Sequence, residues 1–211
     1  MTDSRSTRAL FWTGPFFAVV FFIVVFAVQG STPGEKDSAA KVVAYYNSHQ
    51  GRTLLSVFIS PLGAALIVLF FSQLAALARE RGVGGAGPIV LVSGAVLWAA
   101  GLLLGAVLEL GLTTSADHAQ SQVAQTFNVL HANDWLLFVG GVAVTLIGAG
   151  LTVLASDILP RWLGWVVLVA GVGSLIGPGG FLGFFLGPLF MLVAGVMLAT
   201  RSSSDAPAVP A

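Results

Sequence analysis

The sequence predicts an all-α integral membrane protein, a polytopic bundle of six transmembrane helices with two extracytoplasmic amphipathic helices. Of the 211 residues, 56% are hydrophobic and only 9% are charged, whereas a soluble domain typically carries about 25% charged residues. The mean hydropathy is +0.94. The charged residues are also separated by uncharged stretches about as long as the ~20 residues that a spanning helix needs.

The composition excludes several classes of function. Nine basic and nine acidic residues cancel, so the net charge gives no reason to expect nucleic acid as a partner. The absence of cysteine excludes disulfides, thiolate catalysis, iron–sulfur clusters and cysteine zinc sites. We therefore expect membrane lipids or another membrane protein as partners, and no cofactor.

The six predicted spans are apolar segments between basic or turn-forming residues. The first follows Arg5 and Arg8 and is longer than the ~7–15-residue apolar core of a signal peptide. As a single helix, the stretch 162–200 would be ~58 Å long, nearly twice the hydrocarbon thickness. Its middle, Gly177-Pro178-Gly179-Gly180, is a strong turn signal, so we predict two helices there. The spans lie near 9–29, 53–78, 88–111, 135–156, 160–176 and 181–200, in a single domain of residues 1–200.

The basic residues predict the orientation of the bundle. With six spans both termini share a side, and that side holds six basic residues against three on the other. The positive-inside rule then places the termini in the cytoplasm and the protein in the cytoplasmic (inner) membrane. Residues 201–211 lack apolar periodicity and are predicted to be a disordered cytoplasmic tail. The six are Arg5, Arg8, Arg79, Arg81, Arg161 and Arg201, and the three are Lys36, Lys41 and Arg52.

An internal repeat is indicated when the chain is shifted by ~82 residues against itself. Each unit consists of a span, an outer segment and a second span, which suggests a tandem two-span repeat. The last two spans resemble a third unit with a shortened outer segment. The matches outside the apolar helices pair Thr32 with Thr114, Glu35 with Asp117, and Arg79 with Arg161.

Both long outer segments are predicted to be amphipathic helices. The first begins Thr32-Pro33-Gly34-Glu35, the pattern of a capped helix start, and the second begins at Thr114. Basic residues are nearly absent from the second segment, so we expect these helices to cover the end of the bundle rather than lie on the lipid surface. The apolar stripes are Ala39, Val42, Val43 and Tyr46 in the first helix, and Ala116, Ala119, Val123, Phe127 and Leu130 in the second.

Glu109 is the one carboxylate within a predicted span. An acid inside a membrane is a candidate for binding a proton or a substrate, because an uncompensated buried carboxylate is expensive. Glu109 also lies close to the outer end of its helix. A snorkelling side chain, or a pair with Arg52 beneath the outer helices, is therefore an alternative interpretation.

A candidate polar cluster lies in and beside the outer segments. Imidazole and carboxylate groups suit divalent metals, and His131 and Asp134 have the spacing of helical neighbours. No HExxH or similar signature is present, and solvated or interfacial histidines are common, so we predict no metal site. The cluster consists of His49, His118, His131, Asp117, Asp134 and Arg52.

The segment Leu159-Pro160-Arg161-Trp162-Leu163-Gly164-Trp165, followed by apolar residues to Gly171, resembles a stretch in uncharacterised multi-pass membrane proteins of actinobacteria. The segment Ala44-Tyr45-Tyr46-Asn47 and the six-span layout fit the same family. The resemblance implies a bacterial inner-membrane helical protein without an established activity. Physically, the basic residue and the tryptophans anchor a helix at the cytoplasmic interface.

The sequence gives no positive case for an enzyme, since it contains no Ser-His-Asp order, no paired catalytic carboxylates and no phosphate-binding loop. The leading hypothesis is a non-catalytic membrane protein that binds a lipid or a partner protein. The main alternative is a small secondary transporter or proton-coupled permease centred on Glu109. A third hypothesis is a membrane enzyme or metal protein that uses His49, His118 and His131.

Overall fold

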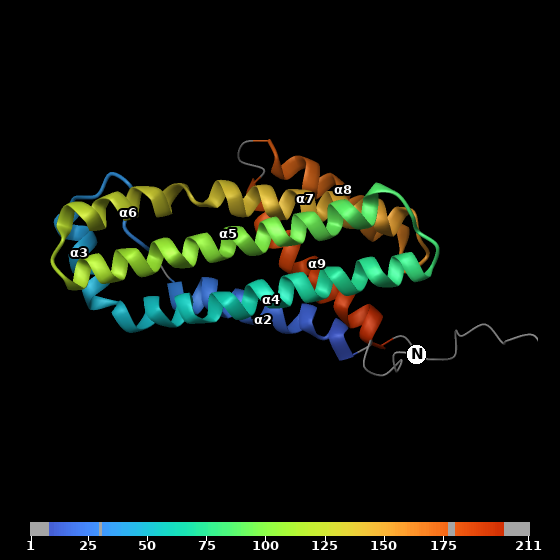
Figure 1. The fold of residues 1–211 in the computed structure, drawn as a ribbon, viewed down its shortest axis with the longest axis horizontal. Coiled ribbons are helices and arrows are strands. Elements are labelled where there is room, and N and C mark those ends of the chain that lie inside the picture. Colours follow the sequence, from blue (N-terminus) through green and yellow to red (C-terminus); the bar gives the residue numbers. More distant parts are fainter. Residues whose placement is uncertain (1–8, 30, 177–179, 201–211) are drawn as a thin grey trace, which may run out of the picture.

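The all-helical architecture predicted from the sequence is confirmed. A computed structural model describes residues 9–29, 31–176 and 180–200, and within them every regular element is a helix and no strand occurs. Long apolar helices lie side by side in one elongated bundle (Figure 1). The predicted turn at 177–179 and the predicted tail at 201–211 lie outside the described residues.

The chain forms eight α-helices and one π-helix within the described residues. They are α2 (Thr13–Ile23), the π-helix η1 (Val24–Gln29), α3 (Ala39–Ser48), α4 (Gln50–Glu80), α5 (Ala86–Asp117), α6 (Ser121–Asn133), α7 (Trp135–Leu154), α8 (Arg161–Ser174) and α9 (Gly180–Thr200).

Five helical segments among the described residues are long and apolar enough to cross a membrane. The predicted span at 160–176 corresponds to α8, which has 14 residues. At 1.5 Å per residue α8 is about 21 Å long, shorter than the hydrocarbon core of about 30 Å. The chain is thus a polytopic helix bundle, and the count of six spans stays a prediction.

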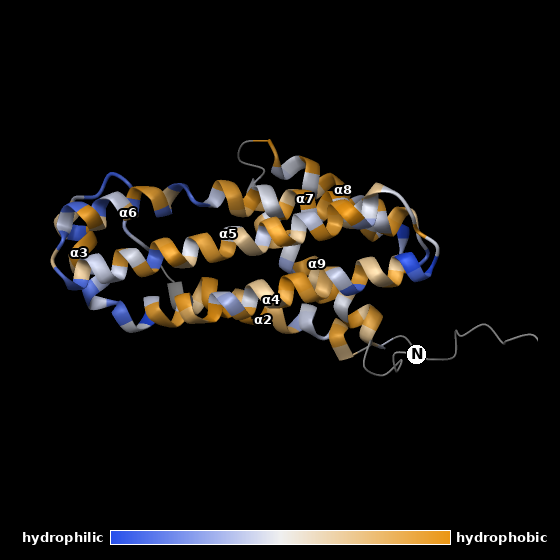
Figure 2. Cartoon of the chain, viewed as in Figure 1, coloured by the Kyte–Doolittle hydropathy of each residue, from blue (hydrophilic) through white to orange (hydrophobic). Residues whose placement is uncertain are grey.

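Helix α5 continues six residues beyond its predicted limit at 111, and α4 begins three residues before its predicted start at 53, at the same end of the bundle. Helices α4 and α5 have 31 and 32 residues, about 46–48 Å of helix. Helices α3 and α6 pack beside this extension, which we call the α3 end (Figure 1). The opposite end, with the α4–α5 and α7–α8 loops, is called the Arg81 end. Hydrophilic residues gather at both ends, and the middle is hydrophobic (Figure 2).

Helix α3 begins later than the predicted capping pattern at Thr32. Its cap is Ser38, whose hydroxyl accepts the backbone N–H of Lys41. The residues before it form a turn instead, because the Asp37 carboxylate accepts the Gly34 N–H at 2.9 Å and the Asp37 N–H donates to the Gly34 carbonyl at 3.0 Å. The Asp37 carboxylate also bonds the Lys41 ammonium at 2.7 Å, which lowers the pKa of Asp37. The predicted start at Thr32 is wrong.

The buried face of α6 also differs from the predicted stripe. Val123 and Leu130 are 43% and 51% exposed, whereas Ala124 and Asn128 are buried. The Asn128 amide donates to the Gly34 carbonyl at 3.0 Å and so ties α6 to the turn before α3. The predicted stripe is correct at Phe127, which packs against the cluster formed with α3 and α5, and wrong at Val123 and Leu130. The stripe of α3 was predicted correctly at Val42 and Tyr46, which pack on α5.

The middle of the bundle is filled by aromatic side chains. Trp98 of α5 is fully buried, with edge-to-face contacts to Phe17 and Phe138 at centroid distances of 5.7 and 6.0 Å. Helices α5 and α7 approach so closely that a Cβ at Gly94 or Gly148 would meet the backbone of the facing helix. Thr145, which faces Gly94 at this contact, is buried with its hydroxyl bonded to the Gly141 carbonyl of its own helix, and the charged side chains lie toward the two ends.

Candidate functional site

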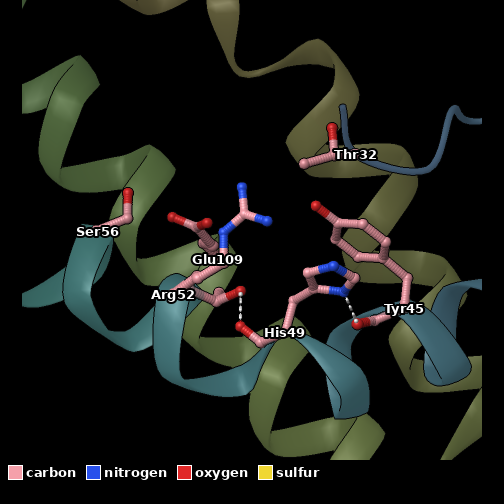
Figure 3. Close-up of a pocket in the computed structure, with 7 residues that line it drawn as sticks. Thr32, Tyr45, His49, Arg52, Ser56 and Glu109 are labelled. Atoms are coloured by element: carbon pink, nitrogen blue, oxygen red, sulfur yellow. Dashed lines mark hydrogen bonds between the residues drawn. The ribbon is translucent and has the colours of Figure 1, made fainter. Parts of the chain in front are cut away.

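A small pocket lies at the α3 end, among residues of α3, α4 and α5 and the loop before α3 (Figure 3). The space that it encloses is about that of one water molecule, and the pocket is partly open to the outside. Figure 3 shows several of the lining side chains directed toward a common space. The lining residues are Thr32, Tyr45, His49, Arg52, Thr53, Ser56 and Glu109.

Glu109 forms the inner wall of this pocket. Its residue is only 5% exposed, and Ser56 of α4, which is also buried, hydrogen-bonds its carboxylate. Arg52 lies one helical turn before Ser56, is exposed, and lines the same pocket. Glu109 is therefore enclosed by protein, and the pocket brings together one acidic and one basic side chain.

His131 and Asp134 adjoin Glu109 from the junction of α6 and α7. The His131 Nδ1 and an Asp134 carboxylate oxygen are 2.8 Å apart, and the two side chains are 21% and 15% exposed. Both groups act electrostatically on Glu109. Gly105, one turn before Glu109, makes room for this junction, since a Cβ there would lie 3.0 Å from the Asp134 carboxylate. The predicted contact between His131 and Asp134 is therefore present, and it lies beside Glu109.

Tyr46 belongs to the same polar region, although the sequence indicated it only as part of an apolar stripe. It is 1% exposed, and its hydroxyl has no hydrogen-bond partner among the described residues. Burial raises the pKa of Tyr46 far above its usual value, and the nearby Glu109 carboxylate raises it further. The phenol is therefore neutral at all ordinary pH values. The helical spacing of the apolar residues predicted that Tyr46 is buried. Nothing in the sequence indicated that its hydroxyl lies near Glu109.

Tyr46→Phe is expected to raise the free energy of unfolding by about 1 kcal/mol, because a buried polar group without a partner costs about 1–3 kcal/mol. Thermal or denaturant unfolding of the purified protein measures this change. Tyr45→Phe, at the half-buried neighbour in the same helix, is the matched control. A loss of stability in Tyr46→Phe would mean that the hydroxyl holds a water molecule or a ligand.

The remaining candidates are divided between the pocket and the surface. The His49 ring stacks on Tyr45 at a centroid distance of 4.3 Å and lines the pocket. Asp117 and His118 are exposed at the end of α5, and His118 Nδ1 contacts the Thr114 carbonyl at 2.8 Å. The three histidines are thus not brought together. Within the described ranges no group of three or more His, Asp or Glu residues is arranged to hold a metal ion.

The fold and this site define a small polytopic helical membrane protein with a buried acid at one end of its bundle. The chain belongs to the family of the domain of unknown function DUF4386, which matches residues 13–202. The resemblance to an uncharacterised membrane protein family is confirmed to that extent. No curated protein and no solved structure matches the chain.

Proposed function

We propose that this protein is a non-catalytic lipid-binding protein, which binds the headgroup of a zwitterionic membrane lipid at the mouth of the pocket at the α3 end. The observation that carries the proposal is the presence of Arg52 and Glu109 in one small pocket. A guanidinium is suited to a phosphate, and a carboxylate is suited to an ammonium group. Phosphatidylethanolamine carries both groups in one headgroup. The hydroxyls of Thr32, Thr53 and Ser56 supply further hydrogen bonds.

The surface of α4 below the pocket supports a lipid rather than a soluble ligand. Four large apolar side chains on α4 are 44–73% exposed and follow Arg52 at helical spacing, which places them along one face. An acyl chain lying along this face would continue directly from a phosphate at Arg52. The four side chains are those of Leu55, Phe58, Leu62 and Leu69.

The location of the protein is part of the same proposal. The bundle lies in the cytoplasmic (inner) membrane of an actinobacterium, with both termini in the cytoplasm, because basic residues are more numerous on that side. The α3 end and its pocket then face outward, so the lipid belongs to the outer leaflet. A partner membrane protein is the other ligand class that the exposed apolar faces could accept.

Arg52→Gln and Glu109→Gln are each expected to lower retained phosphatidylethanolamine about tenfold, since a hydrogen bond to a charged group contributes about 1.5–3 kcal/mol. Native mass spectrometry of the detergent-purified protein, titrated with this lipid, measures the retention. Arg79→Gln and Asp117→Asn change exposed charges outside the pocket and should leave retention unchanged. If Arg52→Gln and Glu109→Gln retain the lipid as the wild type does, the proposal is wrong.

A second candidate function is a proton-coupled permease centred on Glu109. The electrostatic influence of the His131–Asp134 pair on the buried Glu109 favours it, because neighbouring carboxylate and imidazole groups can pass a proton. This function requires a pH-dependent flux in proteoliposomes that Glu109→Gln abolishes. The lipid-binding function requires no such flux in the wild type, so one assay separates the two.

A further inference from the structure

A second, wider pocket lies at the Arg81 end of the bundle, where the α4–α5 and α7–α8 loops meet. Two arginines from separate parts of the chain line it: Arg81 at the end of α4 and Arg161 at the start of α8. Ser156 and Pro160 contribute to the same wall. Neither arginine lines the pocket that contains Glu109, so the two pockets are separate.

The one acidic residue that lines this pocket is weakly held. Asp157 contacts Arg81 at 3.3 Å, but its side chain is 82% exposed and that of Arg81 is 49% exposed. An exposed pair of this kind contributes little to stability. A stronger anion can therefore take the place of the Asp157 carboxylate at Arg81 and contact Arg161 as well. A phosphate group is suited to this exchange, since it offers several acceptor oxygens to two guanidinium groups.

The side chains next to Arg161 place the pocket at the depth of lipid headgroups. Trp162 and Trp165 of α8 are 59% and 58% exposed, and Val166 and Val169 on the following turn are exposed as well. Exposed tryptophans at the end of an apolar helix are typical of the membrane–water interface. Arg161 precedes this pair directly, so its guanidinium lies where lipid phosphates are found.

We propose that this pocket is a binding site for the phosphate of an anionic phospholipid such as phosphatidylglycerol, with Arg81 and Arg161 as its ligands. The phosphate replaces Asp157 at Arg81, and the acyl chains lie against the exposed valines of α8. A headgroup that also carries a positive charge binds more weakly, because both arginines are positively charged and repel it. Phosphatidylcholine is therefore a poorer ligand for this pocket than phosphatidylglycerol.

Native mass spectrometry of the full-length protein, titrated with phosphatidylglycerol or phosphatidylcholine, tests the site. Arg81→Gln and Arg161→Gln should each lower bound phosphatidylglycerol about tenfold. Asp157→Asn should raise it severalfold, because the competing carboxylate is removed. Since a misfolded variant does not gain affinity, this increase separates a ligand role from a structural one. Arg79→Gln changes a basic residue at the same end outside the pocket and should bind phosphatidylglycerol normally.

Three results would overturn the proposal: equal retention of the two lipids, a loss in Arg79→Gln as large as that in Arg161→Gln, or no gain in Asp157→Asn. A parallel titration with inorganic phosphate distinguishes the source of the phosphate group. If inorganic phosphate binding depends on Arg81 and Arg161 while phosphatidylglycerol binding does not, the site takes a soluble phosphate and the lipid assignment is wrong.

Discussion

Replacing Gly148 by alanine is expected to lower the free energy of unfolding by about 3 kcal/mol, the upper end of the usual cost of overpacking. A Cβ at Gly148 would lie on the backbone of Leu91 in α5, and its nearest neighbours are the nitrogen and Cα of that residue. A backbone atom cannot move aside as the end of a side chain can. Helices α5 and α7 would have to separate along their length, and the contacts around Trp98 would loosen with them.

Gly140 provides the matched control, since it lies in the same helix. A Cβ at Gly140 meets nothing within 4 Å. Gly140→Ala should leave stability unchanged or raise it by up to about 1 kcal/mol, the difference in helix propensity between glycine and alanine. Unfolding of both variants in mixed detergent micelles gives the comparison. If the two substitutions have equal effects, helices α5 and α7 are not packed backbone against backbone.

Trp98→Ala is expected to lower the free energy of unfolding by about 3–5 kcal/mol. The Trp98 ring is fully buried and contacts aromatic side chains from three other helices, Phe17, Phe71 and Phe138. Its removal leaves a large cavity where α2, α4, α5 and α7 meet. The same unfolding assay measures the change.

Trp165→Ala is the control for this prediction, because Trp165 is 58% exposed on α8. An exposed side chain of this kind typically changes stability by no more than about 0.5 kcal/mol. Equal losses in Trp98→Ala and Trp165→Ala would contradict the aromatic core described above.

Much of the fold could be predicted because span hydropathy is a local property of the chain. Helices were found at the predicted apolar stretches, and each outer segment contains a helix, although α3 begins at Ala39 and not at Thr32, and α6 at Ser121 and not at Thr114. The predictions of helix starts and buried faces were wrong where a tertiary contact determines the local structure. Asp37 closes a turn with Gly34 and so moves the start of α3 from Thr32 to Ala39. The face of α6 is set by its fit to α5, where Gly111 receives the Phe127 ring, and this fit leaves Val123 and Leu130 exposed.

The candidate site could be predicted only in part. Glu109 was indicated by its isolation in an apolar span, and the spacing of His131 and Asp134 indicated their contact. The other polar neighbours could not be found, because Ser56 of α4 hydrogen-bonds Glu109 and Tyr46 of α3 lies near it, and this arrangement depends on how three helices pack. Asp117 and His118 lie away from the pocket because α5 continues to Asp117, which carries them to the exposed end of the helix.

The proposed orientation places the α3 end and the Arg81 end on opposite sides of the membrane, with the α3 end outside the cell. The absence of cysteine allows a direct test with two single-cysteine variants at exposed positions, Gln122→Cys on α6 and Gly84→Cys in the α4–α5 loop. In intact cells, a membrane-impermeant maleimide should label Gln122→Cys, and it should label Gly84→Cys only after permeabilisation. Labelling of both variants from the same side, or the reverse pattern, would contradict the account.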